Sequence, residues 1–175
     1  MDRTHNPEFT ILEFYVAYKD YIWMMDTTEK MLEKVAIAVN GQPTVTINGQ
    51  EISFKAPYRR ISMYDAIKEY TGFDISGMDE SGIREVCTKL GIHADAKWGK
   101  GKLIDEIFGE KCEKHFVQPT FITDYPVEMS PLTKKHRSKP GLVERFELIV
   151  NGKEIANAYS ELNDPIEQKS RFEEQ

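Results

Sequence analysis

Two glutamates near the C-terminal end of the chain have the spacing of a divalent-cation site. Glu147 and Glu154 lie on either side of Asn151-Gly152, in a stretch whose other residues favour β-strands. Asn-Gly between two such runs is the strongest short signal for a β-hairpin with a two-residue turn. We therefore predict a hairpin of residues Arg145–Val150 and Lys153–Glu161, which folds the two carboxylates toward each other.

The register of this hairpin follows from the turn. Ile149 faces Glu154 across the two strands. Two residues further along, Glu147 faces Ala156, and because side chains alternate along a strand, all four residues share one face. Glu147 and Glu154 are then diagonal neighbours, with Cα atoms about 7–8 Å apart. Mg²⁺ prefers carboxylates, retained waters and substrate phosphates. The hairpin thus favours a magnesium site, and two solvated glutamates on an exposed face are the alternative.

A second set of polar side chains lies on the returning strand. Asn157, Tyr159 and Glu161 alternate and therefore share a face. Strict alternation turns that face away from Glu154, so both sets serve one site only if a β-bulge near Ala156–Asn157 flips the register. An amide, an aromatic ring and a carboxylate suit a ligand with an apolar stem and an ammonium group. The alternative is that they are ordinary polar side chains of a strand, with no ligand to bind.

A third candidate set lies near the N-terminus. Residues Phe9–Tyr18 are rich in β-branched and aromatic residues, which predicts a strand. Glu13 and Tyr15 share one of its faces, and burying Glu13 among apolar neighbours is costly unless a charged group pairs with it. An edge strand with Glu13 in water is the alternative. His5, before the strand, is a weak signal by itself. The sequence contains no pattern of a nucleophile–base pair, a glycine-rich phosphate loop or a Cys/His metal cluster.

The elements that must position these side chains predict a mixed α and β fold with an antiparallel sheet. Helical periodicity, capping residues and turn dipeptides locate them. In chain order we expect a helix at Thr27–Val39 capped by Thr27 or Thr28, a hairpin of Thr44–Ile47 and Glu51–Phe54 around Asn48-Gly49, a helix that begins at Ser62 with Asp65 as capping partner, a strand at Pro119–Asp124, and a helix capped by Asp164 with Pro165 in its first position.

Residues 72–116 differ in character from the rest of the chain. Two short amphipathic helices, Ser81–Leu90 and Lys102–His115, are joined by the glycine-rich segment Trp98–Lys102. The segment is too short to form a core of its own. We therefore expect a small helical insertion that packs on the main sheet.

The composition limits the classes of function. The 175 residues, 40% hydrophobic and 30% charged, fit one compact domain. A net charge of −6 argues against general binding of nucleic acid, which depends on Lys and Arg contacts to phosphates. The densest basic run, Lys134–Lys139, reads as a solvated loop, with a local contact to nucleic acid as the alternative. No stretch approaches the roughly 18 apolar residues of a membrane helix. The two cysteines, Cys87 and Cys112, lack metal-ligand spacing, which favours reduced thiols in a cytoplasmic protein.

Three strings in the sequence resemble the class II lysyl-tRNA synthetases. The string from His5 to Tyr18 (HNPEFTILEFYVAY) closely resembles the second half of motif two of that family. Residues 119–131 (PTFITDYPVEMSP) are similar to the strand and loop that follow. Residues 145–164 resemble the stretch between motifs two and three, and their last part (NAYSELND) is the most specific. The resemblance covers essentially the whole chain in the family's order.

This resemblance implies a partial class II catalytic core over residues 1–175, with a six- or seven-stranded antiparallel sheet, flanking helices and the helical insertion at about 72–116. It implies that ATP and L-lysine react to form lysyl-adenylate, after which the lysyl group passes to tRNA(Lys). Mg²⁺ and a cytoplasmic homodimer are further expectations. By matching position, His5 would lie near the γ-phosphate, Phe9 would stack on adenine, Glu147 and Glu154 would hold Mg²⁺, Tyr15 and Glu161 would receive the lysine ε-ammonium with Glu13 nearby, and Asn157 and Tyr159 would line the lysine pocket.

The sequence also departs from the family pattern. It contains neither the Phe-Arg-Asn-Glu start of motif two nor the Gly-x-Gly-x-Asp-Arg segment of motif three, and it lacks motif one and the anticodon-binding domain. The arginines of those segments make strong charge-assisted contacts to ATP, so we expect little activity from the chain alone. A paralogous ligase that attaches lysine-like groups to a protein, or a non-catalytic lysine- or nucleotide-binding module, are the alternatives.

Overall fold

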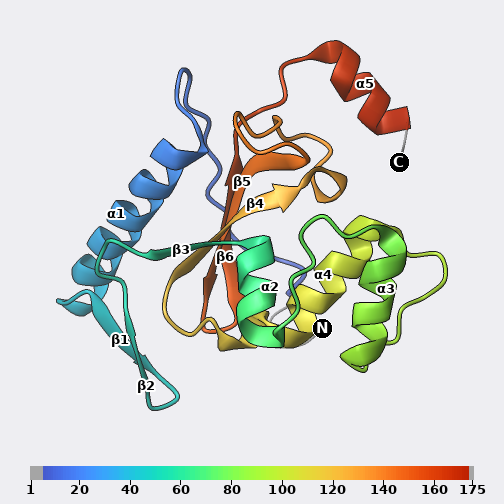
Figure 1. Cartoon of the computed structure of the whole chain (residues 1–175). Coiled ribbons are helices and arrows are strands. Elements are labelled where there is room, and N and C mark those ends of the chain that lie inside the picture. Colours follow the sequence, from blue (N-terminus) through green and yellow to red (C-terminus); the bar gives the residue numbers. More distant parts are fainter. Residues whose placement is uncertain (1–5, 174–175) are drawn as a thin grey trace.

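The computed structural model describes residues 6–173 of the chain. Helices cover both faces of a central sheet, with α1 on one side and α2 to α4 on the other (Figure 1). The helices are α1 (Tyr21–Asn40), α2 (Met63–Thr71), α3 (Glu80–Lys89), α4 (Lys100–Lys111) and α5 (Pro165–Glu173), with 3₁₀ turns η1 (Glu113–His115) and η2 (Val127–Met129). The strands are β1 (Thr44–Ile47), β2 (Gln50–Ser53), β3 (Arg59–Ser62), β4 (Thr120–Pro126), β5 (Leu142–Val150) and β6 (Lys153–Tyr159). No helix in this part of the chain has the length and apolar character of a membrane span.

Four strands form the central sheet in the order β3-β4-β5-β6. β5 is antiparallel to both of its neighbours, whereas β3 is parallel to β4. The parallel pair is possible because the long connection through α2, α3 and α4 separates the two strands, and parallel neighbours need such a crossover. The predicted α+β class with flanking helices is confirmed. Residues 6–173 supply four strands of this sheet, not six or seven, and one of the strand pairs is parallel.

Alternation along β5 divides the interior into two hydrophobic cores. Phe146, Leu148 and Val150 point toward α1, where they pack with Tyr21 and Met25. The odd-numbered side chains Val143 and Ile149 point toward α2, α3 and α4. Because side chains alternate along a strand, the odd-numbered Arg145 and Glu147 also lie on the side of these three helices. The candidate site is therefore built between the sheet and the segment that was predicted to be an insertion.

The two helices predicted within residues 72–116 are confirmed with shifted ends. α3 begins one residue early, and α4 ends at Lys111, after which η1 completes the connection to the sheet. Ile83, Leu103 and Ile107 are fully buried and share one core with Ile122 of β4. Packing on the sheet thus supplies the core that the segment is too short to form alone. Its assignment as an insertion in a larger domain stays a prediction.

Both predicted Asn-Gly hairpins are confirmed. Asn48 and Gly49 have φ of 51° and 80°, and Asn151 and Gly152 have φ of 53° and 65°. Two consecutive positive φ angles define the type I′ turn, whose twist matches that of the flanking strands. The predicted caps of α2 and α5 are also confirmed by their hydrogen bonds. The backbone N–H of Asp65 donates to the Ser62 hydroxyl, and the N–H groups of Ile166 and Glu167 donate to the Asp164 carboxylate.

The predicted start of α1 is wrong. The helix begins at Tyr21, and its cap is Asp20, whose carboxylate accepts a hydrogen bond from the N–H of Trp23 at 3.0 Å. Thr28, which we expected near the cap, is buried inside the helix. The reason is tertiary packing: Tyr21 and Met25 belong to the core on this side of the sheet. Burial of these two side chains extends the helix by almost two turns beyond its periodic segment.

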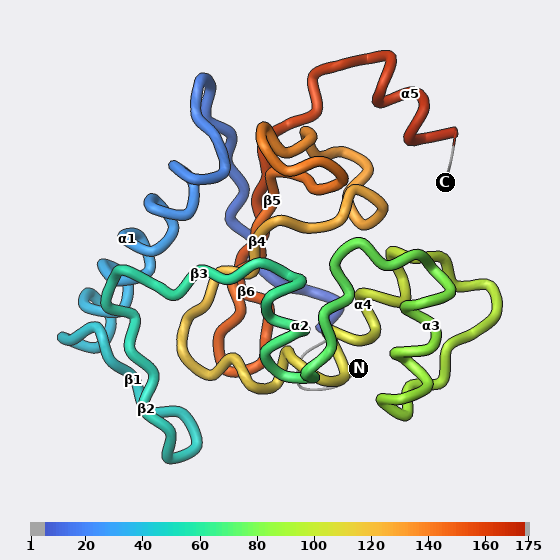
Figure 2. The backbone as a smooth tube through the Cα atoms, viewed as in Figure 1, coloured from blue at the N-terminus to red at the C-terminus, as the bar shows by residue number. Residues whose placement is uncertain are grey.

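The predicted strand at Phe9–Tyr18 is not present. The segment runs past the sheet without forming a ladder before the chain turns into α1 (Figure 2). A strand requires a partner for its backbone N–H and C=O groups, and no strand among residues 6–173 pairs with this one. Its side chains are exposed, including those of Ile11 and Leu12. Glu13 therefore lies in water, as in the alternative that the sequence left open.

Candidate active site

A β-bulge at Ile155 interrupts the pairing of β5 with β6. Ile149 pairs with Glu154, as the turn predicts. The next pair is Leu148 with Ala156, which leaves Ile155 as one extra residue on β6. A bulge of this kind shifts the alternation of side chains beyond it. The flip of the register that a shared site requires is therefore present, one residue earlier than the Ala156–Asn157 position expected for it.

The bulge changes which residues share a face. Glu147 pairs with Asn157, not with Ala156 as predicted, and Arg145 pairs with Tyr159. Ala156 instead packs on the α1 side of the sheet. On the side of the three helices, the bulged register places Asn157 and Tyr159 beside Glu147. The carboxylate pair and two residues of the predicted lysine pocket therefore belong to one surface.

The Glu147 carboxylate is held by an arginine from the same strand. Its Oε1 lies 2.5 Å from Nη2 of Arg145, and each of the two side chains is 16% exposed. The Nε–H of Arg145 donates to Oδ1 of Asn157 at 3.2 Å. The guanidinium also donates to the carbonyl of Met129 and to the hydroxyl of Ser130. Arg145 thus connects β5, β6 and the loop after β4.

Negative charge accumulates next to this pair. Partial burial raises the pKa of Glu154, and the nearby Glu147 carboxylate raises it further. Glu154 is exposed as a residue, but its carboxyl group lies close to the body of the protein and to a second carboxylate. Burial also raises the pKa of Glu113, on η1, with Glu147 as the second cause. A bound cation would relieve the repulsion among these groups.

An irregularity in β4 adds an aromatic ring to the site. Asp124 has φ of 59°, and the β4–β5 register shifts between Thr123 and Tyr125. Tyr125 consequently packs in the same core as Ile122. Its ring centroid lies 4.6 Å from the guanidinium carbon of Arg145, a cation–π distance. The hydroxyl of Tyr125 is buried without a hydrogen-bond partner among residues 6–173. Burial and the charge of Glu147 raise the pKa of Tyr125 well above 10.

The predicted lysine-binding residues form a negative group at the end of β6. Tyr15 donates a hydrogen bond from its hydroxyl to Glu13 at 2.7 Å, and this bond is the main cause that raises the pKa of Tyr15. Glu161 and Tyr159 raise it further. The pKa of Tyr159 is raised by burial first and by Glu161 second. The exposed N-terminal segment therefore lies within electrostatic reach of Tyr159 and Glu161.

The two remaining predicted ATP contacts are not assembled here. Phe9 is 76% exposed, so its ring is not packed in the folded chain. Stacking of Phe9 on adenine stays a prediction. His5 lies outside the described residues.

The donor set fits a cation that is shared with a phosphate ligand. Within residues 6–173, no three His, Cys, Asp or Glu side chains are grouped as metal ligands. Mg²⁺ in nucleotide sites commonly uses one or two carboxylates, with waters and phosphates as its other ligands. Glu147 and Glu154 match that smaller set, and the raised pKa of Glu154 indicates that its negative charge is poorly compensated by the protein. The pair fits a Mg²⁺–nucleotide better than a metal held by protein alone.

The basic run is largely engaged in contacts within the chain. Arg137 pairs with the buried Glu144 and with Asp20, and Lys139 lies 2.5 Å from Asp124. Lys135 and His136 also have acidic partners, Glu167 and Asp124 respectively. These contacts fix the loop between β4 and β5 against α1 and α5. They favour a structural role for the run over a contact to nucleic acid.

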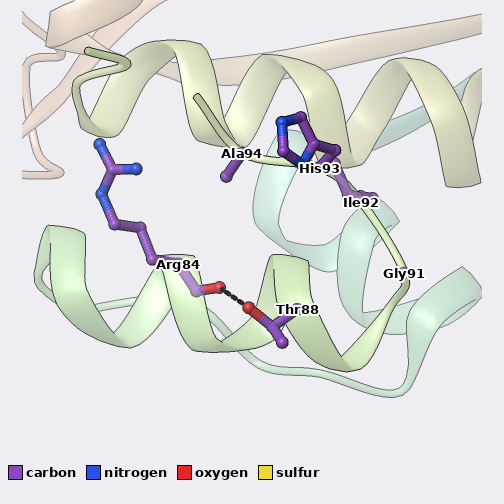
Figure 3. A pocket seen from close by; sticks show the side chains of 6 residues that line it. All are labelled: Arg84, Thr88, Gly91, Ile92, His93 and Ala94. Carbon is purple, nitrogen blue, oxygen red and sulfur yellow. Dashed lines mark hydrogen bonds between the residues drawn. The ribbon is translucent and has the colours of Figure 1, made fainter. Parts of the chain in front are cut away.

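A separate hollow of about 520 Å³ lies beside α3, and its lining includes Arg84, Thr88 and His93 (Figure 3). The Thr88 hydroxyl donates to the Arg84 carbonyl, and the Arg84 guanidinium donates to the carbonyls of residues 95, 96 and 98. Arg84 therefore serves to fix the loop after α3. The hollow holds none of the predicted site residues.

Sequence reasoning missed Arg145 and Tyr125 as members of the site. Arg145 stands two residues before Glu147 on a predicted strand, so their shared face was visible in the sequence. The position of Tyr125 depends on the irregular backbone at Asp124, which no residue pattern indicates.

Comparison with known proteins places these features in a family. The sequence matches the tRNA synthetases of class II (D, K and N) over residues 1–175. A lysine–tRNA ligase of Porphyromonas gingivalis is 67% identical over the whole chain, which covers 30% of that protein. Lysine–tRNA ligases of Christiangramia forsetii and Azobacteroides pseudotrichonymphae are 66% and 61% identical over the whole chain, which covers 31% and 35% of them. The chain thus spans about a third of the length of these relatives. Because the family match extends over all of its residues, the protein belongs to the class II tRNA synthetases of the D, K and N group.

Proposed function

We propose that this chain is the part of a lysine–tRNA ligase that binds lysine and the metal-bound phosphates of ATP. The observation that supports the proposal most directly is the bulge at Ile155, because the bulged register gives Asn157 and Tyr159 the same face as Glu147 and Glu154. The names and identities of the relatives support the choice of lysine. In the proposed reaction, a lysine carboxylate oxygen attacks the α-phosphorus of ATP, pyrophosphate leaves, and the lysyl group then passes to tRNA(Lys).

The ATP half of the proposed site rests on Glu147 and Glu154. These carboxylates would hold Mg²⁺, which when bound neutralises charge on the phosphates. Arg145 holds one oxygen of Glu147, so the carboxylate is already oriented before a ligand arrives. Preorganised charge of this kind needs no nucleophilic side chain, in agreement with the lack of a nucleophile pattern in the sequence.

The lysine half rests on the negative group around Tyr159. Glu13 accepts a hydrogen bond from Tyr15, and Glu161 lies near enough to raise the pKa of the same tyrosine. A lysine ε-ammonium placed there would gain charge-assisted hydrogen bonds. Asn157, fixed by Arg145, would contact polar atoms of the same ligand.

Several features of the whole protein remain expectations. We propose a cytoplasmic homodimer that contacts tRNA(Lys) outside the surface described above. The arginines of motifs two and three are not part of this sequence, and we expect the chain alone to be inactive because it cannot neutralise the ATP phosphates fully. A helical insertion at residues 72–116 of a larger catalytic domain is part of the same proposal.

The test is lysine-dependent exchange of pyrophosphate into ATP. The full-length protein encoded by its gene should catalyse exchange, and the 175-residue chain alone should not. Replacement of lysine by asparagine or aspartate should abolish exchange, which controls for the other specificities of the family. Exchange by neither protein would refute the proposed function and would favour a non-catalytic binding module.

A further inference from the structure

Arg145 makes more polar contacts than any residue to which the sequence assigned a role. Its Nη2 lies 2.5 Å from Glu147, its Nε donates to Asn157 at 3.2 Å, and its Nη1 donates to the Met129 carbonyl at 3.1 Å and to the Ser130 hydroxyl at 3.0 Å. These contacts use all three guanidinium nitrogens. One connects to the candidate metal pair and another to the candidate lysine pocket.

The surroundings hold the guanidinium in one orientation. The ring of Tyr125 lies 4.6 Å from its central carbon, and the side chain is 16% exposed. Ser130, which accepts one of its hydrogen bonds, is itself fixed because the buried Arg171 donates to the Ser130 carbonyl. A planar group with five donors can satisfy such a set of partners at fixed angles, whereas a lysine ammonium cannot.

We propose that Arg145 is a positioning residue that links the carboxylate of Glu147 to the amide of Asn157, and so couples the metal–nucleotide site to the lysine site. This inference rests on the proposed function. Arg145 holds Oε1 of Glu147, and the second carboxylate oxygen would then be the one to contact a cation. By donating to Oδ1 of Asn157, it also fixes which amide atom is the acceptor and turns the Asn157 amine away from the guanidinium.

Opposite effects on the two ligands follow from this geometry. Arg145 competes with a bound cation for Glu147, because both are positive and share the same carboxylate. Removing its charge should therefore strengthen the binding of Mg²⁺. The same change releases Asn157 and should weaken the binding of lysine. Removal of a side chain that only stabilised the fold would weaken the binding of both Mg²⁺ and lysine.

The experiment measures pyrophosphate exchange by the full-length protein with R145Q and R145K, and the affinity for lysine by titration calorimetry without Mg²⁺ or ATP, which should change in parallel with the KM for lysine. For R145Q we expect the KM for lysine to rise about tenfold, as for loss of one charge-assisted hydrogen bond, and the half-saturating Mg²⁺ concentration to fall severalfold. R145K keeps the charge but not the fork of donors. It should restore the Mg²⁺ dependence and leave the KM for lysine raised.

R137Q is the matched control. Arg137 also pairs with a β5 carboxylate, the buried Glu144, at 2.5 Å, but on the other face of the strand. This variant should lower the thermal midpoint without a change in the KM for lysine or in the Mg²⁺ dependence. If R145Q does not fold, the N157A single variant is compared with the N157A/R145K double variant. Adding R145K to N157A should then cause no further rise in the KM for lysine.

Three results would overturn the inference. In the first, the wild-type protein catalyses exchange, but R145Q leaves the KM for lysine and the half-saturating Mg²⁺ concentration both unchanged or both raised. This result would reject the coupling role and leave the proposed function intact. Multiplying effects of R145K and N157A would mean that the two residues act independently. Absence of exchange by the wild-type protein would reject the proposed function, and the inference with it.

Discussion

Replacing Glu154 by glutamine should make the chain more stable at neutral pH while it removes a candidate metal ligand. Glu147 and Glu154 lie on the same side of the β5–β6 hairpin, near its turn. Glutamine keeps the shape of the side chain and removes its charge. The substitution therefore removes the repulsion between two neighbouring carboxylates, which lowers the stability of the wild-type chain.

The size of the gain follows from the strand geometry. Diagonal neighbours in a hairpin are about 7–8 Å apart, and two unit charges at that distance repel by about 2 kcal/mol at an effective dielectric constant of 20. Glu154 is exposed and Arg145 offsets part of the repulsion, so we expect about 0.5–1 kcal/mol. For a chain of this size, that corresponds to a rise in the thermal midpoint of about 1–4 °C.

The pH dependence identifies the charge of Glu154 as the cause. Burial first and the Glu147 carboxylate second raise the pKa of Glu154 in the folded chain, so the folded state binds the proton more tightly than the unfolded state does. The cost of this charge is therefore absent below the unfolded pKa of about 4.3 and develops as the pH rises through the folded value. The stability gain of E154Q should accordingly be absent at low pH, full at pH 7.5, and smaller at high salt.

Thermal unfolding of E154Q, E51Q and wild-type chains at two pH values and two salt concentrations measures this effect. Glu51 lies exposed on β2, so E51Q controls for the loss of one negative charge. In the full-length protein, E154Q should also reduce lysine-dependent exchange by about 100-fold. A midpoint for E154Q at pH 7.5 and low salt that is no higher than that of E51Q would refute the argument from repulsion.

Substitutions at three further positions test the packing around the site. Tyr125→Phe removes a buried hydroxyl without a partner among the described residues, so the unfolding free energy should stay constant or rise by up to about 1 kcal/mol in denaturant titrations. Arg171→Met leaves the carbonyl of Thr133 unpaired and removes one of the two hydrogen bonds to the carbonyl of Ser130; it should cost about 3 kcal/mol and increase proteolysis of α5, and unchanged cleavage would contradict this. Ser62→Ala removes the cap of α2 and should cost about 1 kcal/mol, whereas Ser62→Asp should retain most of the stability.

Local signals predicted the local structure well. The Asn-Gly turns and the caps at Ser62 and Asp164 each depend on a few neighbouring residues, and the structure has them where the sequence indicates. The start of α1 could not be predicted in this way. Burial of Tyr21 beneath a distant part of the chain decided between Asp20 and the threonines at 27 and 28.

The candidate site was only partly visible in the sequence. The two-residue turn correctly predicted that Glu154 pairs with Ile149. A bulge was required only if Asn157, Tyr159 and Glu161 belong to the same site as the two glutamates. The residue that bulges is set by packing on both faces of the sheet, which the sequence does not state directly. The contacts of Arg145 depend on the loop at Met129 and Ser130, which is 15–16 residues away in the chain.

The bulge at Ile155 also determines which kinds of sequence change this strand can accept. The Ile155 side chain is 46% exposed, so many other residues should be tolerated at this position. Loss of Ile155 itself should also preserve the phase of β6, because Ala156 would then follow Glu154 directly and still pair with Leu148, and Asn157 would still pair with Glu147. A change that straightened the bulge but kept all the residues would be different. It would turn Asn157 and Tyr159 toward the α1 core, where Ala156 and Ala158 now pack. The faces of the later side chains therefore depend on the one unpaired residue being kept out of the ladder, and not on which residue it is.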